Sequence, residues 1–117
     1  MVKTKQQRRR DRKLQDPAIT LPQSLVAVTS VETPAITRVT VNFASQVQMS
    51  GTTPPQSWVF GTGNQVPVSV FARTPMSITF TLPGTVAVGQ PYTIQPYDPA
   101  VRTLTGGYVA ASTGVLA

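Results

Sequence analysis

The sequence predicts an all-β protein, a β-sandwich of about seven short antiparallel strands. Three observations favour this fold class. Valine and threonine supply 16 and 17 of the 117 residues, and both types suit half-buried, pleated strands. Eleven prolines and eight glycines interrupt the chain too often for long helices. Short apolar stretches recur about every ten residues between these turn residues, which is typical of a sandwich.

The first half of the chain contains the clearest strand. Residues 24–31 are expected to form a first strand that ends before Pro34. Residues 36–43 are expected to form the second strand, with one apolar and one polar face. The apolar face consists of Val39, Val41 and Phe43, and the polar face of Arg38, Thr40 and Asn42. This alternation indicates a sheet with one face on the core and one toward water. Val47 and Met49 are expected to extend the apolar face after a break.

The second half repeats this pattern. Residues 58–60 predict a short strand after a proline-containing loop at 50–56. Three valines then alternate around Pro67, which favours an edge strand or a bulge because proline donates no backbone hydrogen bond: Val66, Val68 and Val70. Residues 77–82 alternate in the same way, residues 95–107 form a proline-rich connection, and residues 108–116 supply the last strand. The predicted boundary places a basic arm at residues 1–22 and one sandwich domain at residues 23–117.

Three segments resemble a known family. Residues 37–45, residues 77–94 and residues 101–109 are similar to the strand motifs of bacterial Ig-like domains of the S-layer type, which are relatives in form of fibronectin type III modules. The resemblance covers roughly residues 24–117. It implies an Ig-like/fibronectin III-like β-sandwich of about seven antiparallel strands. The flexible basic N-terminal arm predicted at residues 1–22 lies outside the resemblance.

Two aromatic residues each allow two interpretations. Tyr92 follows Gly89, which permits a sharp bend, so its hydroxyl is expected to bond to the backbone of that bend as a tyrosine corner; alternatively, the ring fills an edge of the core. For Trp58, the simpler interpretation is a core residue. The alternative is an aromatic anchor on a surface that binds a partner.

The charge is concentrated at one end of the chain. Residues 1–16 carry seven basic and two acidic residues, a net charge of +5, whereas residues 17–117 carry three and two, a net charge of +1. The arm is expected to be disordered in isolation. Its cations are candidates for contact with phosphates or an acidic partner, and the alternative is a solubilising tail: Lys3, Lys5, Arg8, Arg9, Arg10, Arg12 and Lys13.

The composition argues against an enzyme. The chain has no histidine and no cysteine, so the commonest general base, the thiol nucleophile and the usual zinc ligands are missing. Its last hundred residues contain two acidic side chains, Glu32 and Asp98, in different expected loops. We therefore expect no catalytic residues, no metal site, no cofactor and no small-molecule substrate.

The sequence also bears on the compartment. It contains neither an 18-residue apolar run nor the apolar segment of a signal peptide. We therefore expect no membrane span and synthesis in the cytoplasm, with subsequent assembly into a virion.

Two loops are the candidate partner-binding elements of the sandwich, residues 50–56 and residues 95–107. The second holds the one cluster of charged and aromatic residues in the domain, Tyr97, Asp98 and Arg102. The alternative is an ordinary long connection that proline stiffens.

These observations leave three functional hypotheses. The first is a non-catalytic structural component of a viral or phage particle, such as a capsid decoration, minor capsid or tail protein, that contacts other subunits or copies of itself. The second is a nucleic-acid-binding protein that uses the cationic arm without reading sequence. The third is an Ig-like module of a bacterial cell-surface protein.

Overall fold

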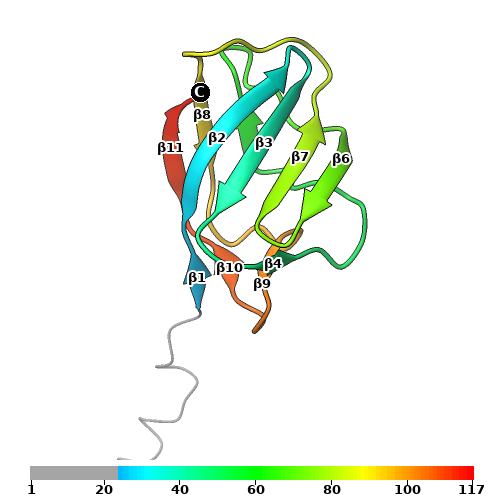
Figure 1. The fold of residues 1–117 in the computed structure, drawn as a ribbon, viewed down its shortest axis with the longest axis vertical. Coiled ribbons are helices and arrows are strands. Elements are labelled where there is room, and N and C mark those ends of the chain that lie inside the picture. Colours follow the sequence, from blue (N-terminus) through cyan, green and yellow to red (C-terminus); the bar gives the residue numbers. More distant parts are fainter. Residues whose placement is uncertain (1–23) are drawn as a thin grey trace, which may run out of the picture.

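The computed structural model describes residues 24–117, so the predicted arm, residues 1–22, lies outside the described part. The described residues form eleven β-strands in three sheets and no helix. The predicted all-β sandwich is therefore confirmed (Figure 1). Among these residues no helix is long and apolar enough to cross a membrane.

One face of the sandwich is a four-stranded antiparallel sheet in the order β2-β3-β7-β6. Its strands are β2 (Val28–Ala35), β3 (Arg38–Phe43), β7 (Ser77–Thr81) and β6 (Ser69–Thr74). The predicted alternation on β3 is confirmed, because Val39, Val41 and Phe43 are buried while the residues between them are half-buried. On the outer face, the hydroxyls of Thr40 and Thr79 are hydrogen-bonded at 2.8 Å across the two central strands.

The opposite face is a three-stranded sheet in the order β11-β8-β5. It consists of β5 (Trp58–Phe60), β8 (Pro91–Ile94) and β11 (Ser112–Val115). Trp58 is completely buried and joins the two faces, since its ring centroid lies 6.3 Å from that of Phe43 and 5.9 Å from that of Phe80. Trp58 is thus a core residue, which supports the simpler of its two interpretations.

A third sheet closes one end of the sandwich, in the order β1-β10-β9-β4. Its two-residue strands are β1 (Leu25–Val26), β10 (Tyr108–Val109), β9 (Arg102–Thr103) and β4 (Val47–Gln48). The first and last expected strands are each divided because they change sheets: β1 pairs in parallel with β10, whereas β2 and β11 join the larger sheets. The structure therefore has eleven strands where about seven were expected.

Two details of the expected strands are wrong. Pro34 does not end the strand before it, because β2 continues to Ala35. The proline is tolerated since β2 is an edge strand with an irregular register between Glu32 and Ala35. The alternating stretch at residues 66–70 is not a strand over its whole length, because β6 begins only at Ser69 and Val68, which precedes it, is 57% exposed. β6 is an edge strand, as Pro67 indicated, and it also contains a register shift.

Tyr92 does not form the expected tyrosine corner. Its hydroxyl lies 3.1 Å from the Ser112 hydroxyl on the neighbouring strand β11, and its ring is buried in the core cluster. The predicted sharp bend at Gly89 is present, with φ +92°.

Candidate partner-binding site

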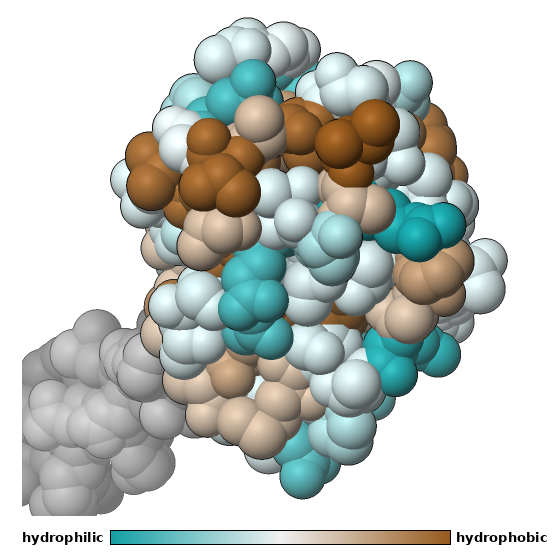
Figure 2. Space-filling model, turned by 45° about the horizontal axis from the view of Figure 1, so that its top comes forward, coloured by the Kyte–Doolittle hydropathy of each residue, from teal (hydrophilic) through white to brown (hydrophobic). Residues whose placement is uncertain are grey.

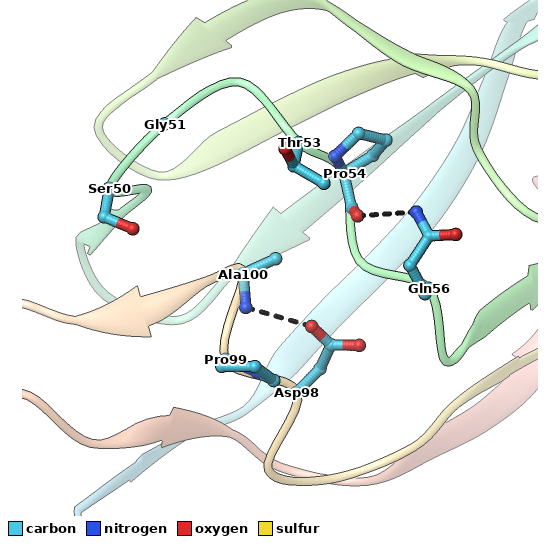
Figure 3. Close-up of a pocket in the computed structure, with 8 residues that line it drawn as sticks. All are labelled: Ser50, Gly51, Thr53, Pro54, Gln56, Asp98, Pro99 and Ala100. Carbon is cyan, nitrogen blue, oxygen red and sulfur yellow. Dashed lines mark hydrogen bonds between the residues drawn. The ribbon is translucent and has the colours of Figure 1, made fainter.

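The two loops predicted to bind a partner meet in the structure. We call this region the loop end, defined as the sheet β1-β10-β9-β4 with residues 50–56 and residues 95–107 (Figure 1). The loops enclose an open pocket of about 340 Å³ (Figure 3). The pocket is lined by Ser50, Gly51, Thr53, Pro54, Gln56, Asp98, Pro99 and Ala100.

Asp98 fixes the two loops to each other. One carboxylate oxygen accepts a hydrogen bond from the Ala100 backbone N–H at 2.9 Å, the local turn that aspartate favours. The other oxygen accepts bonds from the Ser57 backbone N–H at 3.1 Å and from the Ser57 hydroxyl at 2.5 Å. All three donors are uncharged. Asp98 therefore ties the start of β5 to the loop that follows β8.

The adjacent residue, Tyr97, is held in an unfavourable backbone conformation. Its φ is +67°, in the left-handed region that a bulky side chain rarely adopts. Such a conformation costs about 1–3 kcal/mol and persists where neighbouring contacts impose it. The bonds of Asp98 supply that constraint on one side. On the other, the Tyr97 ring packs edge-on against Tyr108, with centroids 5.5 Å apart. Tyr97 remains 57% exposed, so the loop presents this ring to solvent in a fixed position.

Arg102 belongs to the same cluster through Tyr108. Its guanidinium carbon lies 4.2 Å from the centroid of the Tyr108 ring, its cross-strand neighbour. The guanidinium also donates hydrogen bonds to the Gly107 carbonyl at 2.9 Å and to the Gly106 carbonyl. These contacts brace the turn between β9 and β10. The proline-rich segment 95–107 is thus not only a connection, since it contains β9 and an ordered turn.

The structure separates the predicted cluster into two parts. Tyr97 and Arg102 both contact Tyr108, whereas the Asp98 carboxylate is directed at Ser57. The sequence reasoning missed Ser57 and Tyr108. Nothing in the sequence marks Ser57, because the contact spans 41 positions. The alternating pattern placed Tyr108 in a strand without indicating its partners. The seven predicted arm cations lie outside the described residues.

The loop end gathers aromatic and polar side chains and, among the described residues, lacks a metal-binding cluster. Within residues 24–117, no group of three or more histidine, cysteine, aspartate or glutamate side chains is placed to hold a metal ion. The side chains that converge here are aromatic rings, a guanidinium, hydroxyls and one carboxylate. This combination of aromatic and arginine side chains is enriched where proteins bind other proteins.

A second exposed surface lies at the opposite end of the sandwich. It includes Ile36 in the β2–β3 turn and Val88 in the β7–β8 loop, which are 67% and 70% exposed. The backbone N–H of Val86 donates to the Ile36 carbonyl at 2.7 Å, so the turn and the loop are joined. Figure 2 shows the hydrophobic side chains of this end as a brown band.

Comparison with known proteins supports the fold. No protein-family model matches the chain, and no curated protein sequence matches it. Two solved structures of the bacterial S-layer protein SbsC are similar: its N-terminal part, with a TM-score of 0.59, and its domains 1–6, with a TM-score of 0.60. Each is 23% identical to this chain and matches 80% of it. The chain spans 23% of the first and 13% of the second, so it is similar to a portion of each. The S-layer part of the resemblance found in the sequence is therefore confirmed at the level of the fold.

Proposed function

We propose that this chain is a non-catalytic structural module that binds other protein subunits through its loop end. The observation that supports this proposal most strongly is Tyr97, an exposed aromatic ring held by a strained backbone. Strain of this kind is retained at functional sites, and a ring whose position is already fixed loses little entropy on binding.

The surface charge fits the same role. Residues 24–117 contain three arginines against one glutamate and one aspartate, and Asp98 is engaged within the fold. A domain with so little charge experiences weak electrostatic repulsion when it packs against other subunits or copies of itself.

Two settings fit this module. The similarity to SbsC favours a surface module of a bacterial cell, whereas the cationic arm at residues 1–16 favours a virion component made in the cytoplasm. Fractionation of the source separates them: the protein is recovered either with the cell envelope or with purified particles.

Nucleic-acid binding through the arm is the second candidate function, favoured by its net charge of +5. In that case, binding to single-stranded nucleic acid weakens steeply as salt increases and is lost when residues 1–16 are removed.

A site-specific cross-link tests the main proposal. A photoreactive phenylalanine analogue replaces Tyr97 in the source organism, and the matched control carries it at Phe71. The two positions are exposed to 57% and 55%, but Phe71 lies on the outer edge strand β6. We expect a covalent adduct with a structural protein from position 97 and none from position 71. Equal adducts from both positions, or none from position 97, contradict the proposal.

A further inference from the structure

The pocket at the loop end has the properties of a site for a cationic side chain. Asp98 is the one charged residue among those that line it. Two other lining residues, Pro54 and Pro99, have no backbone N–H, and the Pro54 carbonyl already accepts a hydrogen bond from the Gln56 side-chain amide at 2.9 Å. Ser50 and Thr53 add hydroxyl oxygens. In Figure 3 the Asp98 carboxylate lies between the two loops, with Ala100 on one side and Gln56 on the other.

The carboxylate is fixed in place before any ligand arrives. It accepts three hydrogen bonds from Ser57 and Ala100, which hold both of its oxygens. A carboxylate offers about four acceptor positions, so these donors leave capacity for another. Since none of them is charged, its negative charge has no counterion among these contacts. An ammonium or guanidinium group would supply both the missing donor and the missing charge.

A metal ion fits less well than an organic cation. Calcium requires several oxygen ligands and usually more than one carboxylate, whereas the lining residues include one carboxylate. The flat apolar surfaces of the two prolines instead suit the stem of a lysine or arginine side chain.

We propose that this pocket binds a lysine or arginine side chain from residues 3–13 of the same chain. That segment carries seven cations, whereas residues 24–117 offer two carboxylates, those of Glu32 and Asp98. Ser24, to which the segment connects, is also at the loop end: its hydroxyl lies 3.3 Å from that of Thr103 on β9.

The length of the connection permits this contact. Gln7 lies seventeen positions before Ser24. Seventeen residues can span up to about 56–61 Å when fully extended, which exceeds the width of a small domain. A short tether gives an effective concentration of about millimolar, and an exposed ion pair alone is too weak to fill the pocket at that concentration. Occupancy therefore requires the charge-assisted hydrogen bond to Asp98 together with packing of the side-chain stem against the two prolines.

A spin label in the arm tests the contact in the full chain. The protein has no cysteine, so Gln7→Cys provides a single attachment point. The amide signals of the ¹⁵N-labelled protein are measured with the label oxidised and reduced. We expect the oxidised label to lower the signals of residues 50–56 and 98–100 by about half or more, as partial occupancy at millimolar effective concentration requires. Other amides of the loop end should be affected less.

Charge-neutral variants provide the controls. Asp98→Asn should relieve the selective loss, and Glu32→Gln, which removes the same charge from the exposed edge strand β2, should not. Asp98→Asn also changes the hydrogen bonds to Ser57, so a second control keeps Asp98. The spin-labelled protein with Asp98 intact is measured again in about 1 M salt, where the Debye length falls to about 3 Å. The selective loss of signal should then disappear.

Three outcomes would overturn the proposal. The first is a uniform loss of amide signal over the whole loop end. The second is a selective loss of the signals of residues 50–56 and 98–100 that persists both in Asp98→Asn and in high salt. The third is a selective loss only when the spin-labelled and ¹⁵N-labelled molecules are mixed, which would assign the cation to another copy. None of these results bears on the cross-link from position 97, so the two proposals fail separately.

Discussion

Substituting Gly107 by alanine should detach the first described strand from the sandwich. A Cβ atom at this position would lie 1.9 Å from the carbonyl oxygen of Ser24 and 2.7 Å from its carbonyl carbon, so the backbone must move. Two hydrogen bonds depend on the present position, from the Tyr108 N–H to Ser24 at 3.0 Å and from the Ala110 N–H to Val26 at 2.9 Å. At about 1 kcal/mol each, together with partial exposure of the Val26 side chain, the free energy of unfolding should fall by about 3 kcal/mol.

Urea denaturation followed by tryptophan fluorescence measures this change, since Trp58 is fully buried in the core. Gly51→Ala is the matched control: a Cβ atom at Gly51 would have no other atom within 4 Å, so the free energy of unfolding should change by less than about 1 kcal/mol. Equal stability of Gly107→Ala and Gly51→Ala would refute the parallel pairing of β1 with β10.

Three further substitutions test the loop contact and the core by the same denaturation experiment. Asp98→Ala removes three hydrogen bonds but relieves strain in the adjacent residue, so the free energy of unfolding should fall by about 2 kcal/mol. The control, Glu32→Ala at an exposed position, should lower it by less than about 0.5 kcal/mol. Phe80→Ala should cost about 3–5 kcal/mol because the ring is fully buried, whereas half-exposed Phe71→Ala should cost less than about 1 kcal/mol. Tyr92→Phe removes one hydroxyl contact and should cost about 1 kcal/mol. A cost below about 1 kcal/mol for both Asp98→Ala and Phe80→Ala would contradict the described packing.

The strands with strong alternation could be predicted from the sequence. In β3 and β7 every second residue is a large apolar one, and Val39, Val41, Ile78 and Phe80 are all buried. The small sheet could not be predicted, because two-residue strands such as β9 have no period to detect. Two of the three strand pairings in this sheet, β1 with β10 and β4 with β9, join residues more than 50 positions apart.

The loops of the candidate site could be predicted from composition, but their meeting could not. Proline and glycine marked residues 50–56 and residues 95–107 as connections. The two loops enclose one pocket, and a hydrogen bond between Ser57 and Asp98 holds them together. These two residues become neighbours only when the sandwich has folded. Only a three-dimensional arrangement reveals this contact, and likewise the contact of Tyr97 with Tyr108.

The most direct test of the central claim is the accessibility of the loop end in the assembled state. Because the chain has no cysteine, Ser50→Cys at the loop end and Ala87→Cys at the opposite end each provide one exposed thiol. Their reaction rates with a maleimide are compared between the purified protein and the assembly recovered from its source. If the loop end binds a subunit that excludes water, the thiol at position 50 should react about tenfold more slowly in the assembly, and that at position 87 at an unchanged rate. An unchanged rate at position 50, or slowing only at position 87, would contradict the claim.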